Sequence, residues 1–425
     1  MVIFLYTIVF LILCFISHRK FNKIYNIVSL FAFIWCLFGS LSSLDLIGLR
    51  SPSNLIHGYA LLFIIITSFG IFLFCNKRQY EKNITSDSNI FAKDISTQIE
   101  IVALMLFIPT ILQSVTVLIA YGSLDAVRQS YFAINGFERN QHYLISFFTR
   151  MIPSGLFAGL NVFYAYKILT SYKHRYLFWC IINIVIEIFV KGGRTGIMLI
   201  LIIFFVTLTL SNVSLSTVKR QAGNSYKYLK FFIVFIVTTI VFVTEQRGGS
   251  LIKSFVSYYS GSLSFLDYIV ENRSEYQLDD HLYGYLTFSF IFEPIVFVLK
   301  VLGVTTAKIP SYYFNIVCQK FVDIGNANTQ ILFNNNTTVL YHYLRDFGGF
   351  GILIGSLLYS KLISVAYNGI NPLRRNFELS ALIYVYIGST LINTIMTYQF
   401  YSVEPLFVFV VFYLCTRKNK KYYYE

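Results

Sequence analysis

The sequence predicts an all-α, polytopic integral membrane protein. Of its 425 residues, 56% are hydrophobic and only 13% are charged, whereas soluble domains carry about 25% charged residues. Apolar runs recur along the chain, which is typical of transmembrane helices. An outer-membrane barrel would show short alternating segments instead, and the run Leu199–Leu210 does not alternate. The composition therefore excludes a water-soluble globular protein, a disordered chain and a nucleic-acid-binding domain.

Eleven apolar runs are long enough, or nearly long enough, to cross a bilayer about 30 Å thick. Positive residues (Arg19, Lys20 and Lys23) follow the first run rather than precede it. We therefore interpret this run as the first span and not as a cleaved signal peptide. The predicted spans are residues 2–16, 24–41, 55–75, 100–120, 144–168, 176–190, 195–210, 230–244, 347–366, 378–398 and 403–416.

The charges of the loops predict the orientation of these spans. Cytoplasmic loops collect Lys and Arg, and this bias accounts for the net charge of +14. The C-terminal tail and the loops after the first, third, fifth, seventh and ninth spans are basic. A twelfth apolar segment, Tyr285–Gly303, contains Glu293 and Lys300, and a charge at the bilayer centre costs roughly 3 kcal/mol. Only eleven crossings place every basic segment inside, with the N-terminus outside and the C-terminus inside.

This topology leaves residues 245–346 as one large extracytoplasmic segment between the eighth and ninth spans. Within it, residues 285–303 predict an amphipathic or re-entrant helix. The other outer loops are short, apart from residues 121–143. We find no internal repeat, which argues against the inverted-repeat architectures of transporters. We expect residues 1–425 to form a single membrane domain.

Several metal and cofactor motifs are missing from the sequence. There is no DxD, no HExxH, no zinc-ligand spacing, no Walker A motif and no GxGxxG, and the six cysteines form no CxxC pair. We therefore expect neither a metal nor a cofactor, and no nucleotide-driven transport.

The predicted outer face is biased toward arginine. It has eight arginines and five lysines, whereas the inner face has seven arginines and fourteen lysines. Guanidinium groups bind phosphate through two parallel hydrogen bonds, while lysine acts as a point charge. This bias suits a diphosphate or an acidic polysaccharide, although salt bridges and interfacial snorkelling are an alternative explanation. The outer arginines are Arg50, Arg128, Arg139, Arg150, Arg194, Arg247, Arg273 and Arg345.

Two short motifs place an arginine beside paired glycines at an outer boundary. Lys191-Gly-Gly-Arg194 joins the sixth and seventh spans through a tight turn, and Arg247-Gly-Gly follows the eighth span. Glycine permits close approach of the backbone, so a lipid diphosphate would fit at both places. The alternatives are an ion pair between Glu187 and Lys191 and an ordinary flexible span exit at Arg247.

A third motif, Tyr341 to Gly351, leads into the ninth span. It carries His342, Arg345 and Asp346 together at the outer interface. A histidine titrates near neutral pH and would accept a proton from a sugar hydroxyl, while Arg345 would hold phosphate. Alternatively, the glycines permit helix packing and Arg345 pairs with Asp346.

The order of these features resembles the bacterial O-antigen polymerases, the Wzy-type polymerases of oligosaccharide repeat units. The resemblance covers about residues 120–365 in order. It is carried by the many spans, the Gly-Gly-Arg194 turn, Arg247-Gly-Gly, Tyr258-Tyr259-Ser-Gly261 with Asp267, and Asp346-Phe-Gly-x-x-Gly351.

The resemblance implies a fold similar to the metal-independent, multi-span (GT-C-like) glycosyltransferases that use polyprenyl-diphosphate donors. It implies that a glycan moves from undecaprenyl diphosphate onto a new lipid-linked repeat unit at the periplasmic face of the bacterial inner membrane. The family uses arginines in two outer loops, which correspond here to Arg128 and to Arg247 or Arg273. A chain-length regulator of the polysaccharide is an implied partner.

The chemistry of this reaction assigns roles to the candidate residues. Diphosphate is a good leaving group that needs charge stabilisation, which arginines supply. The acceptor hydroxyl needs a base, and outer tyrosines would stack on sugars, although most interfacial tyrosines are belt residues. The predicted bases are His342, Asp346, Glu245 and Asp267; the predicted substrate-binding residues are Arg128, Arg194, Arg247, Arg273, Arg345, Tyr258 and Tyr259.

The sequence therefore predicts a polymerase of lipid-linked repeat units of O-antigen or capsule. Two alternatives remain. One is an O-antigen ligase, which would share the fold and the donor. The other is a lipid-linked oligosaccharide flippase or another transporter, for which we would expect charged residues within the spans and uniformly short loops.

Overall fold

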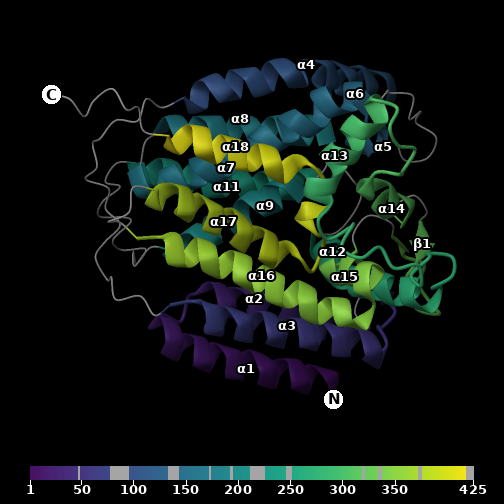
Figure 1. The fold of residues 1–425 in the computed structure, drawn as a ribbon. Coiled ribbons are helices and arrows are strands. Elements are labelled where there is room, and N and C mark those ends of the chain that lie inside the picture. Colours follow the sequence, from purple (N-terminus) through teal and green to yellow (C-terminus); the bar gives the residue numbers. More distant parts are fainter. Residues whose placement is uncertain are drawn as a thin grey trace. The chain divides into compact units, whose positions relative to one another are not determined.

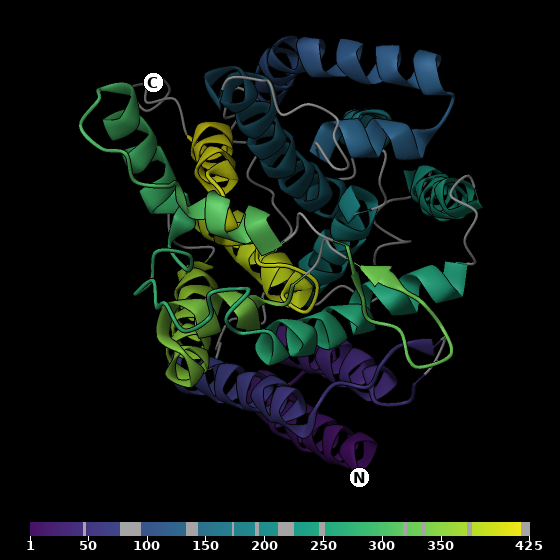
Figure 2. The ribbon, with the colours of Figure 1, turned by 90° about the vertical axis from the view of Figure 1, so that its right-hand side faces the viewer.

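Helices make up nearly all of the described structure, which is a computed structural model (Figures 1 and 2). Four of the described helices are long and apolar enough to cross a membrane: Val2–Phe21, Asn54–Phe74, Ser96–Tyr121 and Gly349–Gly369. The prediction of an all-helical fold is confirmed, and these helices fit a membrane protein. The structure describes residues 1–45, 48–76, 95–132, 143–171, 174–191, 195–210, 225–245, 251–317, 321–333, 337–371 and 376–417.

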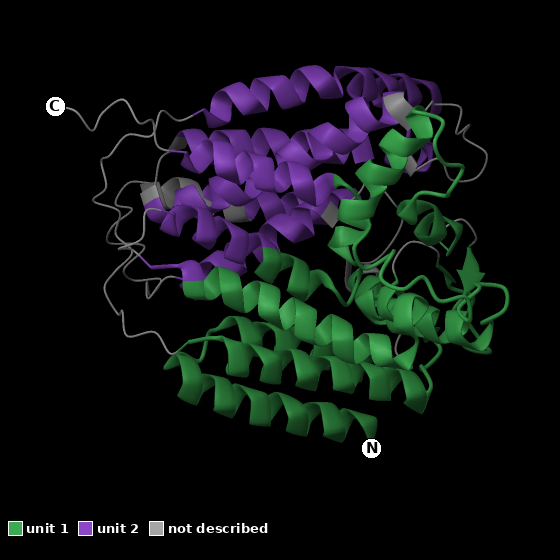
Figure 3. Ribbon diagram, viewed as in Figure 1, with its two compact units in different colours: residues 1–79, 252–368, 387–403 green, residues 80–251, 369–386, 404–425 purple. Residues whose placement is uncertain are grey.

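The chain divides into two compact units, shown in green and purple in Figure 3. Unit 1 comprises residues 1–79, 252–368 and 387–403, and unit 2 comprises residues 80–251, 369–386 and 404–425. Nearly all of the large predicted segment, 245–346, therefore belongs to unit 1. The loop predicted at 121–143 belongs to unit 2.

Unit 1 combines the N-terminal helices with the large segment and the helix that follows it. Each of the spans predicted in this part of the chain coincides with a helix. The elements are α1 (Val2–Phe21), α2 (Ile27–Ser42), α3 (Asn54–Phe74), α12 (Leu251–Glu271), α13 (Ser289–Val301), α14 (Pro310–Val317), β1 (Val322–Asp323), β2 (Leu332–Phe333), α15 (Val339–Phe347), α16 (Gly349–Gly369) and η3 (Gln399–Tyr401).

One end of the bundle in unit 1 joins the carboxyl ends of α1, α3 and α16. The Phe21 ring contacts the Tyr367 ring edge-on, with 5.7 Å between centroids. The Asn368 side chain donates to the carbonyl of Phe74 (2.8 Å) and accepts from the backbone N–H of Asn76 (2.9 Å). These contacts satisfy backbone groups that the helix ends leave without intrahelical partners.

The opposite end of unit 1 joins the loop between α2 and α3 to the large segment. The backbone of Leu49 forms a β-bridge with Gly325, and the Ser264 hydroxyl donates to the carbonyl of Arg50 (2.7 Å). The turn at residues 394–402 meets the same segment, since the Tyr398 hydroxyl donates to the carbonyl of Thr287 (2.7 Å). Residues 43–53, 394–402 and much of 252–346 therefore share one end of the bundle.

The large segment contains more helix than the sequence predicted. The helix expected at 285–303 is present as α13, but α12, which precedes it, was not foreseen. Serines, glycine and tyrosines interrupt the apolar run of α12, so the sequence does not show a continuous apolar segment there. They also dock it: the Tyr259 ring stacks on Phe38 of α2 with 4.4 Å between centroids, and the Ser260 hydroxyl donates to the Phe38 carbonyl (3.2 Å).

Unit 2 is built around α7, which packs closely on α18 through two glycines one helical turn apart. A Cβ atom at Gly155 would lie 2.7 Å from the carbonyl oxygen of Glu404, and one at Gly159 would lie 3.1 Å from the Cα of Val408. Small residues at this spacing let helix backbones approach in membranes. The elements are α4 (Ser96–Tyr121), α5 (Leu124–Phe132), α6 (Tyr143–Ser146), the π-helix η2 (Phe147–Met151), α7 (Ile152–Ser171), α8 (His174–Lys191), α9 (Thr195–Leu210), α11 (Ser225–Glu245), α17 (Phe377–Asn393, shared with unit 1) and α18 (Glu404–Thr416).

We expect Gly351→Ala to destabilise the protein by about 1–3 kcal/mol, because overpacking a filled site costs about that much. A Cβ at Gly351 would lie 2.0 Å from the carbonyl oxygen of Tyr343. Gly58→Ala in α3 is the matched control, since nothing lies within 4 Å of a Cβ there. Thermal unfolding of the purified protein measures the difference, and equal stability of the two variants would contradict the proposed clash.

Candidate functional site

The short helix α15 carries three of the predicted site residues. It begins at Thr338, whose hydroxyl accepts from the N–H of Leu340 (3.2 Å), and it ends at Gly348, whose φ of 60° favours glycine. His342, Arg345 and Asp346 are all buried, with exposed fractions of 0%, 2% and 0%. The structure therefore brings them together inside unit 1 rather than on its surface.

Asp346 fastens the chain before α13 to α15. Its carboxylate accepts from the backbone N–H groups of Leu286 (3.1 Å) and Thr287 (2.6 Å). Burial raises the pKa of this carboxyl, and the hydrogen bonds from residues 284–287 oppose that rise. Both carboxylate oxygens are occupied, so the geometry gives Asp346 a positioning role.

Arg345 is held by the segment that precedes α13. Its Nη1 donates to the carbonyl of Asp280 (2.6 Å), and its Nη2 donates to the side-chain oxygen of Gln277 (3.5 Å). The guanidinium also lies 5.9 Å from the centre of the Tyr313 ring. The hydrogen bonds of Arg345 go to Asp280 and Gln277 and not to Asp346, so the alternative pairing expected from the sequence is not what the structure has.

His342 lies in an aromatic enclosure. Its ring centroid is 5.2 Å from that of Phe314 and 4.9 Å from that of Tyr398, and neither ring nitrogen forms a hydrogen bond with the described residues. Burial lowers the pKa of His342 to about 3, although the backbone of Thr338 opposes this shift. A neutral, enclosed imidazole is a poor base for a substrate hydroxyl.

Asp267 ties α12 to the start of α3. It accepts from the backbone N–H of Ser53 (3.1 Å) and from the Ser53 hydroxyl (2.5 Å), and its exposed fraction is 3%. Of the two neighbouring tyrosines, Tyr259 is buried against Phe38, and Tyr258 packs near the Phe333 ring at 6.4 Å between centroids. These three residues hold the segment in place.

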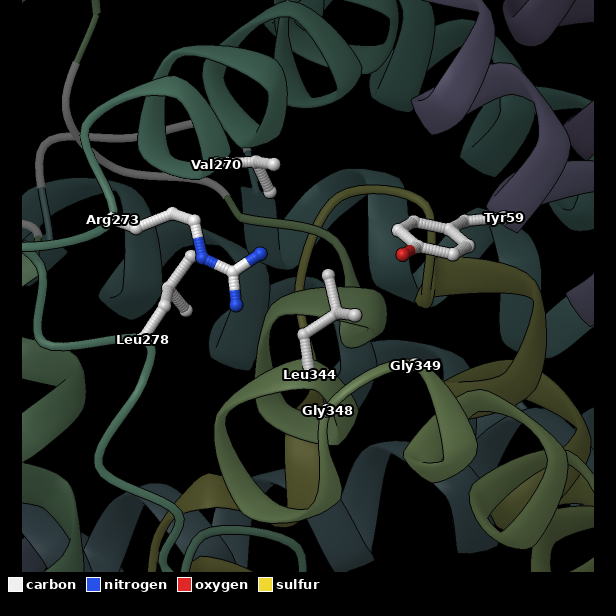
Figure 4. A pocket seen from close by; sticks show the side chains of 7 residues that line it. All are labelled: Tyr59, Val270, Arg273, Leu278, Leu344, Gly348 and Gly349. Carbon is white, nitrogen blue, oxygen red and sulfur yellow. The ribbon is translucent and has the colours of Figure 1, made fainter.

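Arg273 differs from these buried residues because its side chain is 54% exposed. Its Nε and Nη2 donate to Oδ1 of Asp279 at 3.0 and 2.7 Å. Arg273 also lines a hollow of about 40 Å³, into which its guanidinium points (Figure 4). The other lining residues are Tyr59, Val270, Leu278, Leu344, Gly348 and Gly349.

The amino end of α16 opens at this hollow, since α16 begins at Gly349. A Cβ at Gly349 would lie 3.6 Å from the Tyr59 hydroxyl. Helix amino ends attract anions through their N–H groups, so an arginine and a helix amino end face the same small space. Ligand pockets usually measure about 300–1,000 Å³, so the hollow takes a phosphate-sized group but not a sugar ring.

The remaining predicted residues lie in unit 2 or outside the described residues. In α5, Nη1 of Arg128 lies 3.9 Å from Oδ1 of Asp125. Glu245 is the exposed last residue of α11. Glu187 and Lys191 form the ion pair offered above as an alternative (3.0 Å). Arg194, Arg247 and Arg139 lie outside the described residues.

The sequence interpretation missed the partners of these side chains. Gln277, Asp279 and Asp280 form the turn that holds both Arg345 and Arg273. The run Gln277-Leu-Asp-Asp280 is polar and follows an arginine, which is the one signal that could have suggested an ion-paired turn. Among the described residues, no group of three His, Cys, Asp or Glu side chains is placed to hold a metal ion.

The chain was compared with protein-family models, with curated proteins and with solved structures, and nothing matches it.

We expect the stability of the protein to fall as the pH decreases from 6.5, partly because of His342. The unfolded chain binds a proton near pH 6.5, whereas the folded pKa is about 3, so the unfolded state binds more protons between these values. Between pH 6.5 and 5 this difference in proton binding lowers the free energy of unfolding by about 2 kcal/mol. Thermal unfolding at both pH values should show a smaller loss for His342→Phe than for the wild type. His281→Phe, at an exposed histidine, is the control, and an unchanged loss in His342→Phe would contradict the assignment.

Proposed function

We propose that this protein is a polymerase of undecaprenyl-diphosphate-linked oligosaccharide repeat units, acting at the periplasmic face of the bacterial inner membrane. The observation that carries the proposal is that Arg273 and the Gly348-Gly349 corner line one hollow. These two features are far apart in the sequence. Gly348 and Gly349 belong to a motif that carries the resemblance, and Arg273 is one of the arginines to which the resemblance assigns a role. One phosphate group of the donor's diphosphate in this hollow would receive the guanidinium on one side and the amino end of α16 on the other.

The proposed topology has eleven crossings, with the N-terminus outside. The two ends of the unit 1 bundle support it. The end formed by residues 21, 74–76 and 367–368 consists of segments expected inside, and the end formed by 43–53, 394–402 and the large segment consists of segments expected outside. Each end of the bundle therefore gathers only segments that the charge pattern assigns to one side of the membrane.

The helix α13 supports the proposal that the lipid-linked substrate enters from the bilayer. Its 13 residues span about 20 Å, which is too short to cross a bilayer of about 30 Å. Ser289, Glu293 and Val296 face the protein, and Glu293 accepts a hydrogen bond from the Ser311 hydroxyl (2.8 Å). Its opposite face exposes apolar side chains, as expected of a helix in the outer leaflet: Ile291, Phe292, Ile295, Val298 and Val301.

In the proposed reaction, the acceptor hydroxyl attacks the anomeric carbon of the donor sugar. The new C–O bond forms as the bond to the diphosphate oxygen breaks, and Arg273 stabilises the charge on the departing diphosphate. Three of the predicted bases are buried, and the fourth, Glu245, belongs to unit 2. Asp279 is 66% exposed and already contacts Arg273. Once phosphate engages Arg273, the Asp279 carboxylate is free to take the hydroxyl proton.

The two alternative functions predict different phenotypes. Loss of an O-antigen ligase leaves polymer unattached to its lipid acceptor, whereas loss of a polymerase leaves single repeat units. Loss of a flippase removes both the polymer and the single repeat units. A chain-length regulator remains a proposed partner, since it would set the distribution of lengths and not the chemistry.

We expect cysteines at residues 283 and 304, which flank α13, to react from the same side of the membrane. Tyr283 and Val304 are 80% and 67% exposed, so Tyr283→Cys and Val304→Cys present accessible thiols. In a variant lacking the six native cysteines, a membrane-impermeant maleimide added outside should label both. Labelling of only one would mean that residues 285–303 cross the membrane, and it would overturn the eleven-span topology.

We expect Arg273→Lys and Arg273→Ala to reduce polymerisation by about 10²-fold, the typical effect of removing one charge-stabilising donor. The readout is the ladder of surface polysaccharide in a strain that lacks the native gene. Arg50→Lys is the matched control, because Arg50 is 48% exposed and paired with Glu271 but does not line the hollow. A normal ladder in both Arg273 variants, at wild-type protein levels, would reject the proposed diphosphate site.

A further inference from the structure

A second group of polar side chains lies within unit 2, among helices α4, α7 and α8. At its centre is Glu100 of α4, whose exposed fraction is 0%. Its Oε2 accepts from the hydroxyl of Tyr164 (2.8 Å) and from the side-chain amide of Asn183 (3.4 Å). The same amide donates to Oδ1 of Asn161 (3.0 Å). Asn161 and Asn183 lie near the middle of α7 and α8, far from the helix ends.

Two oxygens of this cluster have no hydrogen-bond partner, namely Oε1 of Glu100 and Oδ1 of Asn183. Exchanging the oxygen and nitrogen of the Asn183 amide does not solve this, because the oxygen would then face the oxygens of Glu100 and Asn161. Both unpartnered atoms are acceptors, and buried acceptors are normally satisfied. Each of these two oxygens can therefore accept a hydrogen bond or bind a cation.

The charge of Glu100 is also uncompensated within the described residues. The basic side chains nearest in sequence on the same helices are engaged elsewhere, since Lys167 pairs with Glu378 (3.0 Å) and Lys191 pairs with Glu187 (3.0 Å). None of the ion pairs formed by the described residues includes Glu100. An ionised carboxylate buried without a partner is strongly unfavourable, and ionisable residues within spans mark ion sites.

We propose that Glu100, Asn183, Asn161 and Tyr164 form a binding site for one small monovalent cation, with sodium as the ion that fits this chemistry. Hard cations take carboxylate and amide oxygens. A cation between Oε1 of Glu100 and Oδ1 of Asn183 satisfies both oxygens and balances the single charge. A proton on Oε1 of Glu100 that is donated to Oδ1 of Asn183 would balance the same charge, so the test below separates the two by comparing the dependence on sodium with the dependence on pH. A divalent ion would leave one positive charge in excess.

This site is independent of the proposed polymerase site, because its residues all belong to unit 2. It also adds a buried carboxylate within the spans that the sequence did not reveal. Glu100 sits at the edge of the predicted span 100–120, where a carboxylate suggests solvent, but α4 begins at Ser96 and buries it. A sodium site would couple the stability of the α4–α7–α8 packing to the ion.

The test measures thermal unfolding of the purified full-length protein in NaCl and in choline chloride at equal ionic strength. We expect sodium to raise the unfolding temperature by on the order of 5 °C, because a ligand that binds only the folded state stabilises it. Binding of radioactive sodium to the same preparation should be saturable. Equal unfolding temperatures in the two salts, or a dependence on pH without one on sodium, would overturn the proposal.

Three variants identify the site. Glu100→Gln keeps the shape and removes the charge, so it should lose the sodium effect while unfolding in choline chloride at or above the wild-type temperature. Asn183→Ala removes one ligand and should weaken sodium binding at least tenfold, which keeps the test decisive if Glu100→Gln fails to fold. Glu378→Gln removes a carboxylate paired with Lys167 and should respond to sodium as the wild type does. A wild-type sodium effect in Glu100→Gln or Asn183→Ala would reject the site.

Discussion

Two buried carboxylates hold the large segment of unit 1 against the bundle, and the arrangement of the candidate site depends on them. Asp267 accepts from both polar groups of Ser53 at the start of α3, and Asp346 accepts from the N–H groups of Leu286 and Thr287. A carboxylate removed from water must find donors inside the protein. Each of these two finds them in a distant part of the chain, so each fixes where that part lies.

This constraint separates residues that hold the site from residues able to act on a substrate. Arg345 looks at least as suitable as Arg273 for binding phosphate, since it adjoins a histidine and an aspartate in the sequence. Its donors, however, are directed at Asp280 and Gln277 in a buried position. Arg273 contacts an exposed carboxylate at the rim of a hollow, and exposed ion pairs contribute little stability. Exchange of that partner for a diphosphate is therefore the easier step.

Unit 2 contains a buried carboxylate, Glu100, whose hydrogen bonds are incomplete. Tyr164 and Asn183 satisfy one oxygen of Glu100 and leave the other without a partner. An unmatched carboxylate oxygen and an unmatched amide oxygen occur together in this hydrogen-bonded cluster, and the proposed ion site depends on that pairing. We thus propose an anion-binding site in unit 1 and a cation-binding site in unit 2.

The sequence by itself determined where the apolar helices lie, because an apolar run is a local feature, but it did not reveal α12. All eleven predicted spans coincide with helices, and α13 appears within the segment expected to contain it. The tertiary structure alone decided which polar side chains are occupied. The donors to Asp267, Asp346 and Glu100 lie 214, 60 and 64 residues away in the chain. Hydrogen-bond partners at such separations leave no local pattern. For that reason His342, Arg345 and Asp346 looked available in the sequence, Arg273 could not be told apart from the other predicted arginines, and Glu100 did not stand out.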